Sequence, residues 1–278
     1  GTMSNITGKK LTEEEIILNE RRIETLLHLH NMSVEPISQF TSYALEQGIN
    51  LTKSKIGFLA FVNEEETEMV IYAFSEGIFK KSQLEKLPWT IKIQGGVLGA
   101  AIKDRKPVVL NNYQTESEGK RGYPDWHVNI DRFLNIPIFD EDKIVLVAGV
   151  GNKVTDYNES DIKQLTLLMT EMYNIIKSKK AASDLKESEK KYRELTEWLP
   201  LTVYETDKTG KITYANKKAF QLFGYAENDL IEGKNLLEFM APESQEKVVQ
   251  NINRVFSAEQ AVEPEYTAIK KDGTKLSI

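Results

Sequence analysis

The segment from Lys143 to Asp161 has the composition of an anion-binding loop: an apolar run, two glycines, a lysine, and a polar stretch before a predicted helix. Such a segment favours phosphate, because free backbone N–H groups and the helix dipole attract an anion. The spacing argues against this chemistry. Gly149 and Gly151 stand in GVGNKVT, which contains neither the GxxxxGK[ST] of a P-loop nor the GxGxxG of a dinucleotide site.

Large aromatic side chains in two irregular segments form the second candidate site. Trp89 stands in KLPWTIKIQGG, and Trp126 and His127 stand in the polar, turn-rich segment 114–129. An apolar surface with a few polar groups is the usual make-up of a small-ligand pocket. The predicted lining residues are Trp89, Leu98, Asn111, Trp126, His127 and Phe133. Core packing is the alternative for the aromatic residues, and anchoring of the loop is the alternative for His127.

Composition removes several classes of chemistry. The chain has no cysteine, which excludes disulfides, Cys-ligated metal sites, Cys nucleophiles, thioether-linked haem or bilin, and a cysteinyl-flavin adduct. His28 and His30 are two residues apart on a predicted helix, so they point to different faces and do not chelate one metal. No G-x-S-x-G stands at a strand end. We therefore expect no catalytic activity and no metal site, and the identity of any cofactor stays open.

Charge and hydropathy limit the partners. The formal net charge of -6 and the pI of about 5.4 give no basic surface for nucleic acid. No apolar run reaches the roughly 18 residues of a membrane span, and GTMSNITGKK lacks the apolar core of a signal peptide. We expect a cytoplasmic protein that neither inserts into a membrane nor binds nucleic acid.

Two helices are predicted to precede the first strands, over Thr12–Met32 and Val34–Thr52. In the first helix, the residues that recur at helical spacing are Ile16, Ile23, Leu26, Leu27 and His30.

The strands are predicted to form hairpins. IGFLAFVN and MVIYAF make the first pair, and RFLNIPIF and KIVLVAGVGNK make the second. Between the two pairs lie an irregular segment over 75–94, a short helix that stops before Pro107, a strand to Asn111, and the long loop.

A long helix is predicted from Glu159, with Asn158 as its cap. Its first half carries a core stripe of Leu165, Leu168, Met172, Ile175 and Ile176. From Lys177 to Glu197 the helix is highly charged. The thin apolar seam of this second half is Ala182, Leu185, Tyr192 and Leu199. The other heptad positions of that frame are the polar Glu189 and Thr196, so we expect a weak coiled coil.

The pattern restarts after Pro200 with two short strands, a helix KKAFQLFGY, a polar helix around 242–256, and two strands split by Asp272-Gly273. The whole chain is therefore predicted to be α+β.

The order of elements over about residues 20 to 176 resembles a GAF domain. The resemblance implies an antiparallel sheet flanked by helices, with the loop 114–129 over a ligand pocket.

The segment GVGNKVTDYNESDIKQLTLLM is similar to the end of GAF domains in microbial sensor proteins. It also resembles the NKFDE motif of cyclic-nucleotide-phosphodiesterase GAF domains, through Asn152, Lys153, Tyr157 and Asp161. Tyr157 replaces Phe, and Ile162 stands where the motif has Glu, which argues against cyclic-nucleotide binding. Lys153 at a strand end and Asp161 in the first helical turn are placed to pair. We interpret the four motif residues as a structural clip between strand and helix.

Residues 196–278 resemble a PAS domain through VYETDKTGKITYANKKAFQLFGY. Asp207 and Gly210 lie in its first turn, and Asn216 opens a helix. The preceding LKESEKKYRELTEWLP is similar to the linker before such domains in sensor histidine kinases. Members of this family continue through another strand after TKLSI, so we expect a PAS domain that is truncated at its C-terminus.

The expected division is a tag or disordered segment over 1–10, a GAF domain with its N-terminal helix over 11–176, a connecting helix over 177–197, and a truncated PAS domain over 198–278. We expect the input region of a sensor histidine kinase, which binds an unknown small molecule and signals to a downstream kinase or output domain. Its homodimer seam is predicted at Ala182, Leu185 and Tyr192. Two alternatives remain: a dimerisation scaffold without ligand, and a haem sensor that uses His127 or His30.

Overall fold

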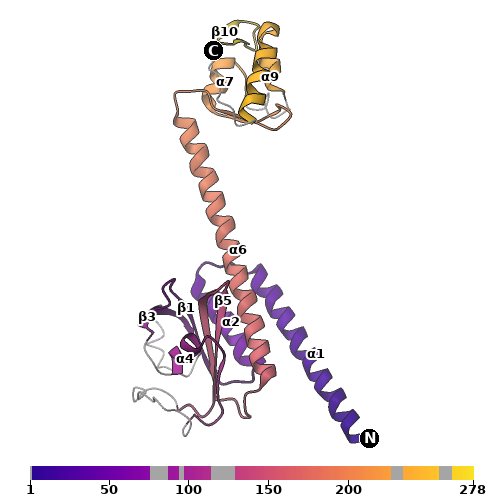
Figure 1. Ribbon diagram of the computed structural model, residues 1–278, viewed down its shortest axis with the longest axis vertical. Helices are drawn as coiled ribbons and strands as arrows, with labels where there is room; N and C mark the ends of the chain where they lie inside the picture. Colours follow the sequence, from indigo (N-terminus) through magenta and orange to yellow (C-terminus); the bar gives the residue numbers. More distant parts are fainter. Residues whose placement is uncertain (1, 76–86, 94–96, 114–128, 227–233, 257–264) are drawn as a thin grey trace. The chain divides into compact units, whose positions relative to one another are not determined.

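The computed structural model describes residues 2–75, 87–93, 97–113, 129–226, 234–256 and 265–278 (Figure 1). It divides into two compact units, residues 1–181 and 182–278. Both contain antiparallel strands and helices, which confirms the predicted α+β class. No helix in the described ranges combines the length and the hydropathy that crossing a membrane requires.

The first unit is built on a six-stranded antiparallel sheet with strand order β3-β2-β1-β6-β5-β4. Its strands are β1 Ile56–Val62, β2 Glu68–Phe74, β3 Trp89–Lys92, β4 Val108–Leu110, β5 Phe133–Asp140 and β6 Lys143–Gly151. The two predicted hairpins are β1–β2 and β5–β6, and they join through the central pair of β1 and β6.

Strand β3 corrects the prediction of an irregular segment over 75–94. Residues 89–92 pair with β2, so that Trp89 lies opposite Ile71 and Ile91 lies opposite Met69. The segment is short and polar on its outer face, as edge strands often are, which hides its alternation from a search for long apolar runs.

Helices cover both faces of this sheet (Figure 1). Helices α1 Thr2–Asn31, α2 Ile37–Leu51 and α6 Glu159–Trp198 supply side chains to the core on one face. Helix α4 Val97–Asp104 packs on the other face. The core stripe predicted for α6 is confirmed, since Leu165, Leu168, Met172 and Ile176 are buried and Ile175 packs against them.

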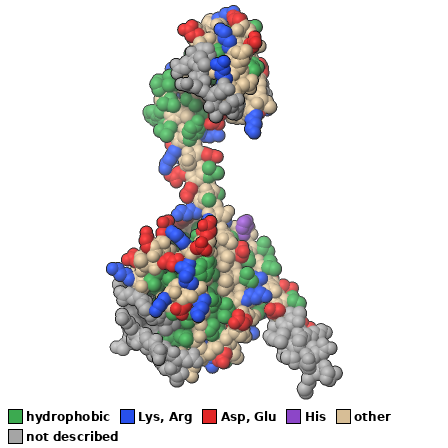
Figure 2. Space-filling view, viewed as in Figure 1, with side chains coloured by type: hydrophobic (Ala, Val, Ile, Leu, Met, Phe, Trp, Pro, Cys, Tyr) green, Lys and Arg blue, Asp and Glu red, His purple; other side chains and the backbone are tan. Residues whose placement is uncertain are grey.

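Helix α1 is rotated from the face that its apolar stripe indicates. Ile16, Ile23 and Leu27 are more than half exposed, and Leu29 and Thr25 are buried instead. Figure 2 shows hydrophobic side chains on the surface along this helix. Polar contacts hold this orientation, because Gln164 of α6 accepts a hydrogen bond from Arg22 and donates one to Asn19. The helix also begins at Thr2, within the residues expected to precede the domain.

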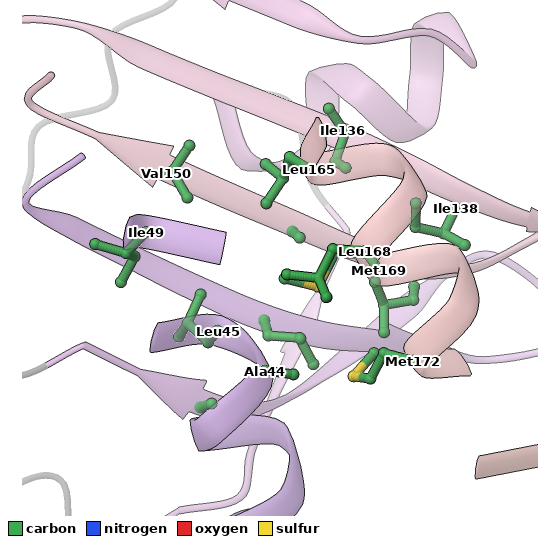
Figure 3. Close-up of a cluster of buried hydrophobic side chains, with 14 of the residues drawn as sticks. Ala44, Leu45, Ile49, Ile136, Ile138, Val150, Leu165, Leu168, Met169 and Met172 are labelled. Atoms are coloured by element: carbon green, nitrogen blue, oxygen red, sulfur yellow. The ribbon is translucent and has the colours of Figure 1, made fainter. Parts of the chain in front are cut away.

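Helices α2 and α6 interlock over the sheet in Figure 3. Leu45, Ile49, Leu165 and Met169 point toward the strands that carry Ile136 and Val150 (Figure 3). The helices come this close because Gly48 has no side chain. A Cβ there would lie 2.9 Å from both Leu165 Cδ1 and Met169 Cε.

The glycine loop considered above is part of the central strand. Gly149 of β6 pairs with Phe58 on one side and with Asn135 on the other, so its backbone belongs to the sheet. A Cβ at Gly149 would lie 2.1 Å from Phe58 Cε1 and 3.0 Å from Phe133 Cζ. Gly149 therefore makes room for two aromatic rings and is not a phosphate-binding residue.

The second unit combines two small sheets with helices. Its elements are β7 Tyr204–Thr206, β8 Ile212–Ala215, α7 Lys217–Phe223, the 3-10 helix η1 Leu236–Phe239, α9 Pro242–Phe256, β9 Thr267–Ile269 and β10 Lys275–Ser277. Strand β7 pairs with β8, and β9 pairs with β10. Asn216 caps α7 as predicted, by accepting a hydrogen bond from the Ala219 N–H.

We predict that Gly149→Ala destabilises the first unit by about 1–3 kcal/mol or more, because the added methyl overlaps the ring of Phe58. Denaturant unfolding followed by circular dichroism measures this free energy. Gly48→Ala is the matched control. It meets only the ends of flexible side chains and gains helix propensity, so its cost should be smaller. Equal costs for the two variants would contradict the role of Gly149.

Candidate functional site

A row of aromatic rings crosses the face of the sheet that carries α4. The ring centroids of Trp89 and Phe74 lie 5.6 Å apart, and Phe58 lies 6.4 Å from Phe74. Phe58 stacks on Phe133 at 6.4 Å with 9° between the ring planes, and Tyr113 meets Phe133 edge-on at 6.4 Å. The row passes over β6 at Gly149, where the missing side chain lets Phe58 and Phe133 meet. Phe58, Phe133 and Tyr113 are buried in the core of this face, and Phe74 and Trp89 are partly buried.

The structure distributes the six predicted lining residues unevenly. Trp89 is half-buried and Phe133 is buried, and both belong to the aromatic row. Leu98 lies on α4 with its side chain partly exposed. Trp126 and His127 lie outside the described residues.

Asn111 has a structural role. Its side chain accepts a hydrogen bond from the Tyr157 N–H at 2.8 Å and donates one to the Tyr157 carbonyl at 3.2 Å. Both polar atoms of the Asn111 side chain are therefore bonded to the Tyr157 backbone. Asn111 thus joins the predicted clip to the end of β4.

Sequence reasoning missed Asn135, which fixes α4 over the sheet. Its side chain is fully buried, and Nδ2 donates to the Leu98 carbonyl at 3.1 Å. A buried amide is costly unless it is hydrogen-bonded, so this contact restrains how α4 sits above the aromatic row. The signal was present in RFLNIPIF, where one amide interrupts an apolar strand.

The predicted clip is built around a buried ion pair. Lys153 Nζ donates to Asp161 Oδ1 at 2.7 Å and to Oδ2 at 2.5 Å. The two side chains are only 10% and 8% exposed. Asp161 also accepts the Asn158 N–H at 3.0 Å, and Asn158 Oδ1 accepts the Ser160 N–H at 2.9 Å. Asn158 Oδ1 also accepts the Asp161 N–H at 3.2 Å, so the two residues cap each other and satisfy the first N–H groups of α6.

Hydrogen bonds of Tyr157 connect the clip to the end of α2. Its hydroxyl lies 2.7 Å from Ser54 Oγ, which lies 2.7 Å from Thr52 Oγ1, and Thr52 donates to the Gly48 carbonyl at 2.8 Å. Burial raises the pKa of Tyr157 to about 12, so the hydroxyl stays protonated at neutral pH. Lys153 Nζ lies 5.8 Å from the centre of the Tyr157 ring.

Residues 34–177 match the family described as GAF domain, which is more than half of the chain. The chain belongs to the GAF domain family. Residues 190–278 match the family described as PAS fold, so a PAS domain follows the GAF domain.

Among known relatives, the chain is similar to a methyl sulfide methyltransferase-associated sensor of Methanosarcina acetivorans, at 38% identity over 183 residues. The aligned part is 66% of this chain and 18% of that protein, so the chain spans less than a fifth of its relative.

Two solved GAF domains, both from phosphoenolpyruvate-protein phosphotransferases, share the fold. The domain from Coxiella burnetii has 13% identity and a TM-score of 0.52, covering 61% of this chain and 98% of that one. The domain from Acinetobacter has 15% identity and a TM-score of 0.50, covering 59% and 95%.

Within the GAF domain, the clip holds both ends of the segment that connects β4 to β5. Asn111 binds Tyr157 at the first end. At the second end, Asn152 Oδ1 accepts the Asp131 N–H at 2.8 Å, and Asn152 Nδ2 donates to the Asn129 carbonyl at 2.7 Å. Asn152 has a φ of 60°, a left-handed conformation that asparagine adopts more readily than most residues. Residues 152–157, which lead into α6, therefore bind the start and the end of this connection.

The PAS domain contains a cavity of about 250 Å³ with a mainly apolar lining that includes Tyr204, Phe223, Phe239 and Met240. In the parts of the chain that the structure describes, no three His, Asp or Glu side chains are grouped for metal binding.

We predict that Lys153→Met destabilises the GAF domain by about 3–5 kcal/mol, because it leaves the Asp161 carboxylate buried without its partner. The double variant Lys153→Met with Asp161→Asn should lose less, since neither charge is then buried alone. Urea unfolding measures each free energy. Lys191→Met, in an exposed pair with Glu187, is the control and should change stability little. A double variant less stable than the single one would contradict the buried-charge argument.

Proposed function

We propose that this chain is a sensory and signal-transduction module, the input region of a longer protein of the sensor histidine kinase type. The order of GAF and PAS domains and the sensor from Methanosarcina acetivorans support a sensory role. In this proposal the module has no catalytic activity, acts in the cytoplasm, and passes its signal to a downstream kinase or output domain.

The proposed ligand is a small molecule with an apolar or aromatic surface. The observation that carries this proposal is the aromatic row between Trp89 and Tyr113 on the α4 face of the GAF sheet. Trp89 and Phe74, at one end of the row, are only partly buried, so their rings keep surface that a further ring can meet in an offset or edge-on contact. Trp126 and His127 are proposed to complete the site from the β4–β5 connection.

The clip is the proposed route from this site to α6. The connection between β4 and β5 starts and ends at residues bonded to Asn152 and Tyr157. Asn152 and Tyr157 flank Lys153, whose ion pair with Asp161 fixes the first turn of α6. A ligand that shifts either end of the connection therefore acts on the helix through hydrogen bonds at 2.7–3.2 Å.

Helix α6 is the proposed transmitter because it is a single helix of 40 residues that begins at the clip and ends beside the PAS strands. We propose that it works in a homodimer, where two helices have two alternative packings that a ligand can bias.

Native mass spectrometry of the chain purified from cells, without added ligand, tests for the ligand. We expect a small-molecule adduct that is lost when Trp126 and His127 are both changed to Ala. Trp198→Ala is the matched control, since Trp198 is an exposed tryptophan of α6 and the adduct should persist. Protein free of adduct in every variant would favour the ligand-free scaffold.

Hydrogen exchange tests the route through the clip. Asn152→Gly keeps the left-handed backbone and removes the two side-chain hydrogen bonds to residues 129 and 131. We expect faster amide exchange in 129–133 and also in the first turn of α6. Asp156→Ala, which breaks only the exposed pair with Arg132, should leave α6 unchanged. Faster exchange confined to 129–133 would mean that the connection and the helix are not coupled.

A further inference from the structure

The end of strand β5 contacts side chains from both faces of the GAF sheet. Successive side chains of a strand point to opposite faces, and Phe139 and Asp140 are the last two residues of β5. Phe139 lies on the side of α4, where the guanidinium carbon of Arg105 is 5.2 Å from its ring centre. Asp140 lies on the side of α6, where it accepts hydrogen bonds from Lys177 and Tyr173. One strand end therefore joins two helices that the sheet separates (Figure 1).

Arg105, the first residue after α4, fixes the end of that helix to two hairpin turns. Its Nη1 donates to Glu66 Oε2 at 2.7 Å, in the turn between β1 and β2. Its Nη2 donates to the Asp142 carbonyl, in the turn between β5 and β6. The other oxygen of Glu66 accepts the Ile144 N–H at 2.8 Å, so the carboxylate binds both Arg105 and the start of β6. Since Asn135 holds the first turn of α4, the helix is restrained at both ends.

The same β5–β6 turn is bound to α6. Lys177 Nζ donates to the two carboxylate oxygens of Asp140 at 2.8 and 2.7 Å, and the Tyr173 hydroxyl donates to Oδ2 at 3.1 Å. The hydrogen bonds from Lys177 and Tyr173 lower the pKa of Asp140, so the carboxylate stays charged at neutral pH. Every residue from Lys180 to Leu195 is exposed, so this contact lies where α6 leaves the packed part of the GAF domain.

Helix α6 is thus held at two separate points. The clip binds its first turn through Asp161, and the β5–β6 turn binds Lys177, sixteen residues later. At about 1.5 Å per residue, the two points are about 24 Å apart along the helix axis. A shift of one point relative to the other changes the tilt of the helix.

We propose that the β5–β6 turn couples α4 to α6, so that a movement of α4 above the aromatic row reaches α6 at Lys177. The inference rests on the proposed function and adds to the clip a second route from the ligand face to the helix. A ligand that displaces α4 moves Arg105 and, with it, the Asp142 carbonyl. Asp140, two residues earlier in the chain, then moves Lys177 and Tyr173 while the clip keeps the first turn in place.

Hydrogen exchange of the full chain tests this coupling across the sheet. Asp140→Ala removes the contact with α6 and keeps the hydrogen bonds of Arg105. We expect amide exchange in α4, over residues 97–104, to become about threefold faster or more. Asp142→Ala is the matched control, because it removes a carboxylate close by but keeps the carbonyl that Arg105 binds. It should change exchange in α4 by less than about 1.5-fold.

The converse variants start from the other side of the sheet. Arg105→Gln should make exchange over residues 173–179 of α6 about threefold faster or more, and Lys103→Gln, at an exposed lysine of α4, should not. Lys177→Arg keeps a cation beside Asp140, so it should leave α4 close to wild type, whereas Lys177→Met should resemble Asp140→Ala.

Faster exchange confined to the helix that lost its contact would overturn the coupling. An equal rise in every element of the GAF domain would also overturn it, because such a rise reports a loss of global stability. Exposed ion pairs add little to global stability, so the variants should stay folded, which urea unfolding checks. Native mass spectrometry keeps the two proposals apart. An adduct with uncoupled helices contradicts only the second route, and coupled helices without an adduct contradict only the ligand site.

Discussion

The buried pair of Lys153 and Asp161 is the interaction on which the arrangement of the GAF domain depends. Two charges that are nine-tenths buried are stable only when each is paired and hydrogen-bonded. That requirement fixes the end of β6 against the first turn of α6. Tyr157 and Asn152, on either side of the lysine, extend the restraint to the end of α2 and to the β4–β5 connection. The ion pair and its two neighbours therefore position β6, the helices α2 and α6, and the β4–β5 connection.

The two faces of the sheet carry different kinds of side chain. The face under α2 and α6 is filled with aliphatic side chains that interlock around Gly48, which suits a rigid support. The face under α4 carries aromatic rings in a row and one buried amide, Asn135, that restrains α4. Gly149 lets the rings of Phe58 and Phe133 meet across the central strand. The glycine that resembles part of a phosphate loop in the sequence therefore makes room for aromatic side chains.

Local patterns were sufficient to predict the hairpins, the core stripe of α6, and the pairing of Lys153 with Asp161, because spacing along the chain determines each of them. Contacts between distant segments were not accessible in this way. Gln164 of α6 bonds to α1 and so fixes its buried face, and Tyr157 bonds to Asn111. In both cases the two partners lie far apart in the sequence. The heptad frame of α6 is another case. Its polar position Thr196 is buried against the Tyr214 hydroxyl, a contact that the spacing of residues within the helix could not indicate.

Asn216, the residue that caps α7, also holds the end of α6. Its Nδ2 donates to the Thr196 carbonyl at 2.8 Å, and its Oδ1 accepts the Ala219 N–H at 3.1 Å. One side-chain amide therefore joins the last turn of one helix to the first turn of another. A rotation of the end of α6 about its axis would turn α7 with it.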